Sequence, residues 1–245
     1  MKFAMVDEQR REAEPNLKGL CPGCMQPVTA KCGSLRVWHW SHQGRRVCDQ
    51  WWEPETEWHR HWKNLFPLEC QEVFHFAEDG EKHIADVKTE HGLVIEFQHS
   101  AIQSGERLAR EKFYKNMIWV VDCTRLKYDR PRIDNGLHGW QRLRNGDVQT
   151  HHFPDECFPK KWLDSTVPVL FDFDGLNTDN HSGQQNHLMC LLPNRHQGQA
   201  VFFAVNRPTF LEIANGRAQI FDWRAVHTAL DQRYVVVRRR QRSRF

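Results

Sequence analysis

Residues 82–98 read KHIADVKTEHGLVIEFQ, and this stretch decides the fold. The apolar runs on either side of Gly92 predict two strands, at residues 82–89 and 93–98, joined by a tight turn. Asp86 lies in the first strand and Glu96 in the second. Glu96 interrupts an apolar strand, and a buried acid requires a charged partner or a cation. The pair is therefore the first candidate for a functional site.

The segments around this hairpin predict the rest of an α/β core. Pro54 suits the first turn of a helix, and Ser104 suits the cap of a second helix whose Leu108 faces inward. The three strands are expected to pair antiparallel, and a last strand, after the crossover helix, to pair in parallel with one of them. The order is αβββαβ with a mixed sheet. The expected elements outside the hairpin are a helix at 51–66, a strand at 68–76, a helix at 104–116 and a buried strand at 117–123.

Asp86 and Glu96 suggest metal-dependent chemistry. Two carboxylates and the neighbouring Phe97 carbonyl suit Mg²⁺ or Mn²⁺, which prefer oxygen ligands. Such a cation assists hydrolysis of a phosphodiester by neutralising charge and activating water. Gln98 points to the same face as Glu96 and occupies the position where many nuclease cores have lysine; a glutamine orients water but cannot act as a general base. The alternative is a structural ion pair.

The helix before the sheet adds three polar groups. Glu55, His59 and Lys63 are spaced four residues apart, so they share one helical face. If that face packs beside the sheet, Glu55 would be an extra metal ligand, His59 a proton relay and Lys63 a phosphate contact. The alternative is that each is a solvated helix residue.

Five cysteine and histidine side chains near the start of the chain predict a zinc site. Cys21-Pro22-Gly23-Cys24 is a knuckle that turns two thiolates towards one ion, and zinc takes four nitrogen or sulfur ligands. His42 and Cys48, at the end of an expected strand at 35–40, are the favoured second pair, with His39 in reserve. Cys32 is expected to pack as a small apolar side chain. The alternative is that all these residues merely pack.

The chain divides into four predicted segments. Residues 1–50 hold a charged arm or short strand at 1–16 and a zinc-ribbon-like module, and 51–125 hold the core. Residues 126–165 form a turn-rich connector, and 166–245 an α+β region. In that last region we expect strands at 167–173, 187–192, 200–205 and 219–221, and helices at 208–215 and 223–234. The chain ends in arginines that we interpret as DNA contacts or, alternatively, a solvated tail: Arg238, Arg239, Arg240, Arg242 and Arg244.

Composition limits the classes of function. The 245 residues carry 34 Lys and Arg against 31 Asp and Glu, a formal net charge of +3, so any nucleic-acid affinity must come from local patches. The start of the chain does not resemble a signal peptide, and no apolar run is long enough to span a membrane. We therefore expect a cytoplasmic protein with reduced cysteines and no membrane partner.

The sequence also resembles the competence protein CoiA family, nucleases of the restriction-endonuclease-like, PD-(D/E)xK superfamily. The resemblance covers about residues 17–125, with Thr56 where the family usually has serine. It implies a restriction-endonuclease-like core, a role in handling DNA, and a catalytic set of Asp86, Glu96 and Gln98 assisted by Glu55 and His59. The motifs that carry it are Cys21-Pro22-Xaa-Cys24, His39-Trp40-Ser41-His42, Glu55-Thr56-Xaa-Xaa-His59-Xaa-Xaa-Xaa-Lys63, Ala85-Asp86-Val87, Ile95-Glu96-Phe97-Gln98-Xaa-Ser100-Xaa-Ile102, Arg110-Xaa-Xaa-Xaa-Tyr114 and Ile118-Trp119-Val120-Val121.

Three functions fit these observations. The first is a Mg²⁺- or Mn²⁺-dependent deoxyribonuclease with a structural zinc ion. The second is a module of the same fold that binds DNA without cutting it. The third is an adaptor that binds a protein partner through its zinc ribbon and C-terminal region.

Overall fold

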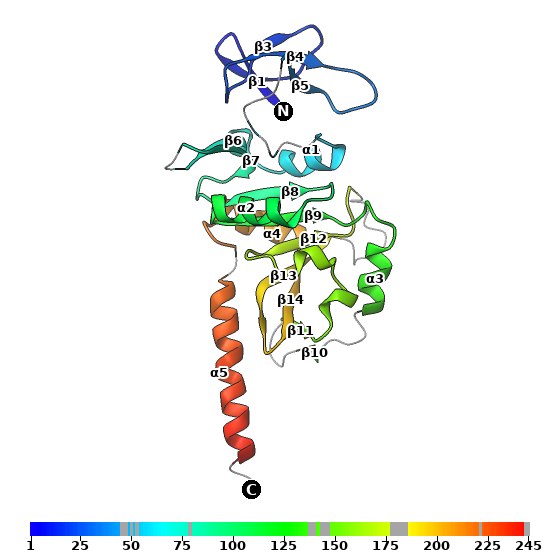
Figure 1. Cartoon of the computed structure of the whole chain (residues 1–245), viewed down its shortest axis with the longest axis vertical. Coiled ribbons are helices and arrows are strands. Elements are labelled where there is room, and N and C mark those ends of the chain that lie inside the picture. Colours follow the sequence, from blue (N-terminus) through cyan, green and yellow to red (C-terminus); the bar gives the residue numbers. More distant parts are fainter. Residues whose placement is uncertain are drawn as a thin grey trace. The chain divides into compact units, whose positions relative to one another are not determined.

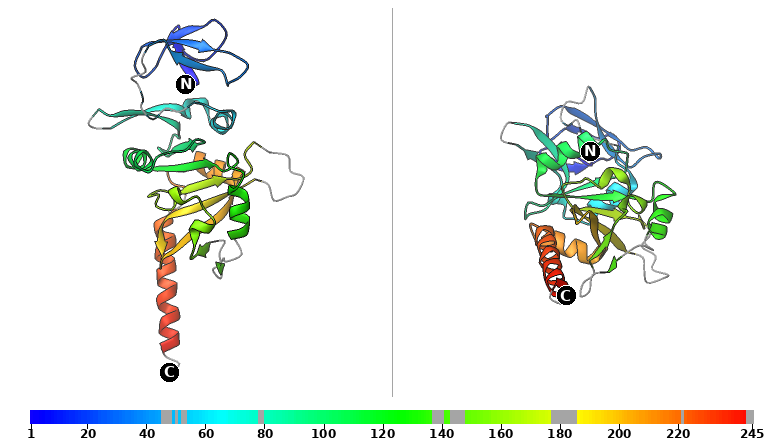
Figure 2. Two further views of the ribbon diagram at one scale, coloured as in Figure 1. Left: turned by 45° about the vertical axis from the view of Figure 1, so that its right-hand side comes forward. Right: turned by 60° about the horizontal axis from the view of Figure 1, so that its bottom comes forward.

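The computed structural model describes residues 1–44, 49, 51, 54–77, 80–136, 141–142, 148–176, 186–220 and 222–242, with the backbone alone for 141–142 and 233–242. The described elements form a mixed α/β fold, as predicted (Figures 1 and 2). The chain divides into two compact units, Met1–Asn116 and Met117–Phe245. None of the described helices is long and apolar enough to cross a membrane.

The first unit begins with an antiparallel sheet in the order β2-β1-β3-β4-β5. Phe3, Ala4 and Val6 are buried, so the predicted arm at 1–16 is a strand hairpin. The strand expected at 35–40 begins only at His39, because Leu35 is 96% exposed and has no core to join. The strands are β1 (Phe3–Val6), β2 (Gln9–Glu12), β3 (Lys18–Leu20), β4 (Pro27–Lys31) and β5 (His39–His42).

The same unit contains the predicted hairpin series. The central strand, β7, pairs antiparallel with β6 and with β8, which confirms the expected antiparallel trio. All five residues of β8 are buried, and β7 alternates between buried and partly buried positions. Gly92 has φ +80, which suits the turn between them. The elements are α1 (Glu57–Asn64), a short 3₁₀ helix (Leu68–Cys70), β6 (Gln71–Phe76), β7 (Lys82–Lys88), β8 (Val94–Gln98) and α2 (Ser104–Tyr114).

Both helices of this unit differ from the prediction in detail. Helix α1 starts at Glu57 rather than residue 51, because Thr56 caps it: the Thr56 hydroxyl accepts the His59 N–H. Helix α2 has Gln103, not Ser104, at its N-cap. Leu108 is 42% exposed and does not face inward.

The second unit holds a six-stranded part of sheet in the order β10-β11-β14-β13-β12-β9. The pair β9–β12 is parallel, and the other neighbouring pairs in this order are antiparallel. The strand predicted at 117–123 as the end of the core is β9, and its parallel partner is β12. The strands are β9 (Met117–Asp122), β10 (Gln141–Arg142), β11 (Gln149–His151), β12 (Val169–Asp172), β13 (His187–His196) and β14 (Gln199–Asn206).

Three expectations for this unit differ from the structure: those for the connector, for a strand at 219–221 and for the end of the last helix. In the part of it that the structure describes, the connector at 126–165 contributes α3, β10, β11 and two 3₁₀ helices, where a turn-rich, irregular segment was expected. Residues 219 and 220 are not in a strand, and residue 221 lies outside the described part of the chain. The last helix continues past residue 234. The helices are α3 (Asp129–Gly136), α4 (Arg207–Gly216) and α5 (Trp223–Arg242), with 3₁₀ turns at Pro154–Glu156 and Lys160–Trp162.

Candidate functional site

Three of the predicted zinc ligands come together in the N-terminal sheet. The ligand atoms of Cys21, Cys24 and His42 all lie within 4.8 Å of one another. Cys24 Sγ is 3.3 Å from His42 Nε2. Tetrahedral zinc, with bonds of about 2.3 Å to sulfur and 2.0–2.1 Å to nitrogen, separates its ligand atoms by roughly 3.5–3.8 Å. The three side chains therefore fit a metal ion such as zinc.

The Cys21–Cys24 knuckle is held by backbone geometry and by packing. Met25 N–H donates to the Cys21 carbonyl over 2.8 Å, with Met25 at φ 56. Gly23 packs so closely on Phe74 that a Cβ there would lie 2.0 Å from the ring. Lys82 Nζ donates to the Gly23 carbonyl over 2.6 Å. The metal knuckle is thus fixed to strands β6 and β7.

Of the two remaining predicted ligands, His39 and Cys48, the structure describes only His39. His39 is not in the cluster: it lies three residues before His42 on a strand whose side chains alternate, so the two point to opposite faces. Its Nδ1–H donates to the Val37 carbonyl over 2.9 Å. Cys48 lies outside the described residues, so its role as fourth ligand stays a prediction. Cys32 packs against the N-terminal core, as expected.

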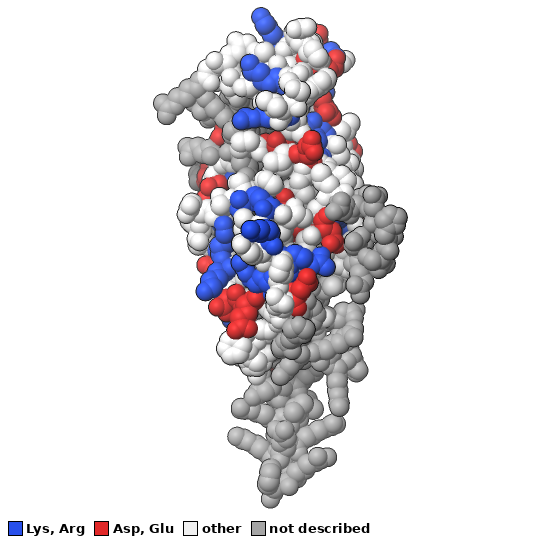
Figure 3. Space-filling view, turned by 90° about the vertical axis from the view of Figure 1, so that its right-hand side faces the viewer, with Lys and Arg blue, Asp and Glu red and all other residues white. Residues whose placement is uncertain are grey.

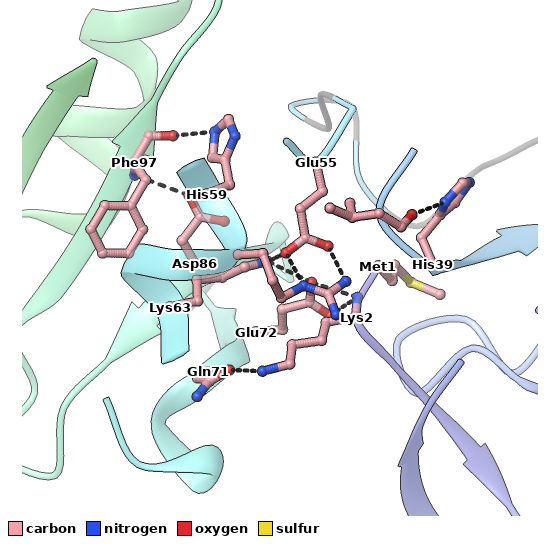
Figure 4. A network of polar contacts seen from close by, with 12 residues as sticks. Met1, Lys2, His39, Glu55, His59, Lys63, Gln71, Glu72, Asp86 and Phe97 are labelled. Carbon is pink, nitrogen blue, oxygen red and sulfur yellow. Dashed lines mark hydrogen bonds and ion pairs between the residues drawn. The ribbon is translucent and has the colours of Figure 1, made fainter. Parts of the chain in front are cut away.

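A cavity in the first unit brings together five of the six predicted catalytic residues. Gln98 is the exception: it is buried in β8, and its Nε2 donates to the Ser100 carbonyl over 3.2 Å. Figure 4 shows the side chains of α1 and the sheet converging on this region. The predicted residues that line the cavity are Glu55, His59, Lys63, Asp86 and Glu96.

Asp86 and Glu96 lie where the β7–β8 ladder opens. The regular ladder pairs Val87 with Ile95. One position further, the Asp86 N–H donates to Glu96 Oε1 over 3.1 Å, and the Phe97 N–H donates to Asp86 Oδ2 over 3.0 Å. Each carboxylate thus accepts a backbone N–H of the opposite strand, as a backbone carbonyl does in a regular ladder. These two hydrogen bonds link the strands beyond the end of the ladder.

The Glu96 carboxylate is in an unfavourable place for a charge. It is 3% exposed, and its burial, followed by the proximity of Asp86, raises its pKa to about 8. Arg110 opposes this effect by donating to Glu96 Oε2 over 2.9 Å. The same guanidinium donates to Glu106 and to the Trp51 carbonyl. At neutral pH the Asp86–Glu96 pair therefore favours holding a proton or another cation.

A second group of charges connects α1 to β1 and β6. Lys63 Nζ is 2.6 Å from Glu55 and 2.9 Å from Glu72. Burial alone would lower the pKa of Lys63, but Glu72 and Glu55 raise it above its ordinary value. The Glu72 carboxylate also accepts the backbone N–H groups of Lys2 and Phe3. In this structure Lys63 and Glu55 therefore bond to each other, whereas the sequence pattern assigned them to phosphate and metal.

His59 joins α1 to the end of β8. Its Nε2 lies 2.7 Å from the Phe97 carbonyl, and its Nδ1 receives the Thr56 N–H over 3.4 Å. Because a backbone N–H donates to Nδ1, the ring proton sits on Nε2 and is donated to Phe97. The ring thereby fixes the backbone beside Glu96 (Figure 4).

Three charged residues of the cavity were not predicted from the sequence. Besides Arg110, they are Asp49, which accepts from His83 Nδ1 and from the Ile84 N–H, and Glu72. Glu72 has φ 47 and lies opposite Asp86, since the pairs on either side of it join residues 71 with 87 and 73 with 85. Such a strand irregularity leaves no periodic signal in a sequence.

Four of the five arginines predicted to contact DNA fall within the C-terminal part of helix α5. The backbone of Arg238–Arg242 belongs to α5, and Arg244 lies outside the described residues. Their part in DNA binding stays a prediction.

Comparison with known proteins adds one finding. Residues 7–50 match the family model described as competence protein CoiA, N-terminal domain, and this segment includes Cys21, Cys24 and His42. No curated protein and no solved structure matches the chain. The chain is therefore CoiA-like in its N-terminal segment, over residues 7–50.

Proposed function

We propose that the first unit is a nuclease that hydrolyses DNA phosphodiesters with a divalent cation bound at Asp86 and Glu96. The observation that carries the proposal is the Asp86–Glu96 pair itself. Burial and mutual repulsion raise the pKa of Glu96 to about 8, so the doubly ionised pair is unfavourable without a cation. Perturbed carboxylates in a cavity are more common at catalytic sites than elsewhere.

The donor set suits a hard cation. Asp86 and Glu96 would hold Mg²⁺ or Mn²⁺ with the Phe97 carbonyl, which has a second lone pair beside the one used by His59. Mg²⁺ commonly takes only one or two protein carboxylates and completes its shell with water and substrate phosphate. Bound there, the cation would supply charge neutralisation at the phosphate and a more acidic water.

The surrounding residues would act by positioning. His59 holds the Phe97 carbonyl, and Arg110 holds Glu96 Oε2, so both fix the acidic pair. Gln98, which the sequence pattern assigned to orienting water, does not line the cavity and donates to the Ser100 carbonyl instead. Lys63 and Glu72 hold α1 against the sheet, which keeps His59 in place.

A second candidate is a module that binds DNA without cutting it. It is favoured by the ion pairs already present: Arg110 lies 2.9 Å from Glu96, and Lys63 lies between Glu55 and Glu72. The Arg and Lys side chains would then neutralise the carboxylates permanently, and no metal ion would bind there. The adaptor function also stays an expectation.

The test is an incubation of the purified chain with single-stranded, duplex and branched DNA. Mg²⁺, Mn²⁺ and a divalent-free buffer are compared. A chelator is avoided in the last arm because it would also remove zinc from the cysteine knuckle. We expect cleavage in Mg²⁺ or Mn²⁺ alone. Tight binding with no cleavage in any arm would favour the second candidate, and neither binding nor cleavage would leave the adaptor.

A further inference from the structure

The second unit has a pocket at the carboxyl ends of its two parallel strands. Strands β9 and β12 are in register from Trp119 and Val169 to Asp122 and Asp172. The segments that follow them enclose a pocket of about 290 Å³. This is near the lower end, roughly 300 Å³, of clefts that bind small molecules, and the carboxyl ends of parallel strands are where α/β sheets bind ligands.

The walls of this pocket are fixed by buried aspartates. Asp122 Oδ1 accepts the N–H and the hydroxyl of Thr124, over 2.8 and 2.6 Å. Asp172 Oδ1 accepts the Gly175 N–H and an Arg207 N–H, each over 2.9 Å. Gly175 has φ +59, and a Cβ there would lie 2.9 Å from Thr124 Cγ2. The two loops therefore approach closely and are held in place before any ligand binds.

Two cations of the first loop and α3 line the pocket. Among the described residues, no carboxylate forms an ion pair with Lys127, whose ammonium lies 4.9 Å from the centre of the Tyr128 ring. Arg130 contacts Asp134 and Asp174, each over 3.1 Å, but its side chain is 56% exposed. The pair with Asp134 is exposed on both sides and contributes little, so Arg130 can exchange it for a phosphate; Asp174 is 11% exposed and also lines the pocket. Asp174 keeps a second partner, the Asn186 N–H.

Positive charge extends beyond the pocket. Arg125, Arg132 and Lys161 lie close enough to oppose the effect of burial on the pKa of Asp129. Lys160 is next to Lys161, and its nearest acid is Asp155 at 3.7 Å. Figure 3 shows Lys and Arg gathered on this face of the molecule, with acids around them. Since the whole chain has a net charge of only +3, this concentration is local.

We propose that this basic surface binds the sugar–phosphate backbone of a nucleic-acid strand. One phosphate occupies the pocket against Lys127 and Arg130, and Tyr128, which is 66% exposed, stacks on a base. A strand is favoured over a free nucleotide because Arg125, Lys160 and Lys161 lie outside the pocket and suit further phosphates. The inference goes beyond the nuclease proposal: none of these residues lines the Asp86–Glu96 cavity, and binding requires no cleavage.

The experiment measures anisotropy of a labelled single-stranded oligonucleotide with the full chain, over a salt series without Mg²⁺ or Mn²⁺. Lys127→Glu should weaken binding about tenfold or more and reduce the salt slope by about 0.7 for each phosphate that the variant no longer neutralises. Tyr128→Ala should weaken it about five- to a hundredfold with an unchanged slope, because stacking involves no counterion. Arg217→Glu, the same kind of charge reversal at an exposed site outside the pocket, is the control and should change affinity less than about twofold.

Equal affinities for wild type and Lys127→Glu would overturn the proposal. So would displacement of the strand by inorganic phosphate or a mononucleotide at matched ionic strength, which would assign the pocket to a free phosphate compound. Lys127-dependent binding to phosphatidylserine vesicles, without binding to the oligonucleotide, would assign the surface to a membrane. Loss of binding in Lys127→Glu supports the inference even if wild type never cuts DNA, so it is tested separately from the nuclease activity.

Discussion

Asp86 and Glu96 bond to each other's strands at the point where the β7–β8 ladder ends. Glu96 Oε1 accepts the Asp86 N–H over 3.1 Å, while Asp86 Oδ2 accepts the N–H of Phe97, the residue after Glu96. Two acids that repel each other are therefore held together by the sheet itself. Because folding brings the two acids together, the free energy of unfolding depends on whether the pair is protonated. The protonation of the pair can therefore be measured as a pH dependence of stability.

The first prediction concerns Glu96 and pH. Its folded pKa of about 8 lies above its ordinary value of 4.5, so the stability it provides is complete below about pH 4.5 and is lost as pH rises through 8. Glu96→Gln cannot lose that proton, and Arg110 keeps its contacts with Glu106 and the Trp51 carbonyl. In urea unfolding in Mg²⁺-free buffer, both proteins should lose free energy of unfolding between pH 5 and pH 9. The loss should be smaller in the variant than in wild type by on the order of 3 kcal/mol. Parallel pH profiles for the two proteins would show that Glu96 ionises normally.

The second prediction concerns Glu72 and Lys63. Burial alone would raise the pKa of Glu72, but Lys63 and the nearby N–H groups hold it well below its usual range. Its stabilising effect is therefore present at neutral pH and is lost in acid, below the ordinary carboxyl range. Glu72→Gln should cost about 3–5 kcal/mol at pH 7, as removal of one partner from a buried ion pair does, and less as pH falls. The exposed Glu8→Gln is the matched control, with an expected change within about 0.5 kcal/mol. Equal stabilities of Glu72→Gln and the control would show that the Lys63–Glu72 ion pair does not stabilise the fold.

The third prediction concerns zinc. The native chain should contain about one zinc ion, and Cys24→Ser or His42→Ala should lose it and unfold the N-terminal sheet, because metal binding contributes to folding. His39→Ala should retain zinc, since His39 lies on the opposite face of β5. Cys48→Ser should lose it if Cys48 is the fourth ligand. Elemental analysis in which His39→Ala loses the metal while His42→Ala keeps it would reverse the ligand assignment.

The fourth prediction concerns the arginine-rich end. If the arginines of residues 238–245 bind phosphates, their deletion should weaken DNA binding on all sequences alike. It should also flatten the salt dependence by about 0.7–0.9 units for each arginine–phosphate ion pair that the deletion removes. A salt titration with an unchanged slope would assign these arginines to solvent.

The sequence predicted the parts of the fold that depend on local patterns. The apolar run of β8 and the turn at Gly92 place Asp86 beside Glu96, and the four-residue spacing of His59 and Lys63 places them on one side of α1. Glu55 precedes the helix but lines the same cavity. Contacts between segments that are distant in the sequence leave no such periodic pattern. Nothing in the sequence indicates that Glu72 would adopt φ 47 and accept the N–H groups of Lys2 and Phe3.

Local chemistry also explains the errors at element boundaries. The helix predicted from residue 51 starts at Glu57 because the Thr56 hydroxyl offers a cap that the apolar pattern does not reveal. Leu108 fits a helical period yet is exposed, while Arg107 and Arg110 of the same helix are buried by their ion pairs with Glu111 and Glu96. The buried face of α2 thus carries paired charges together with Tyr114, a combination that hydrophobic spacing does not predict.

DNA cleavage and DNA binding, measured on the same folded preparations of wild type, Asp86→Asn and Glu96→Gln, test the assignment of the nuclease site most directly. Each variant keeps the shape of its side chain and removes one negative charge. Gln98→Ala, which removes a side chain that does not line the cavity, should be milder, and the exposed Glu90→Gln serves as control. We predict that cleavage in Mg²⁺ or Mn²⁺ falls by about 10²-fold or more in both charge variants, as loss of a several-kcal/mol electrostatic effect requires, while DNA binding persists. Cleavage at the wild-type rate in both variants would contradict the assignment of the site to Asp86 and Glu96.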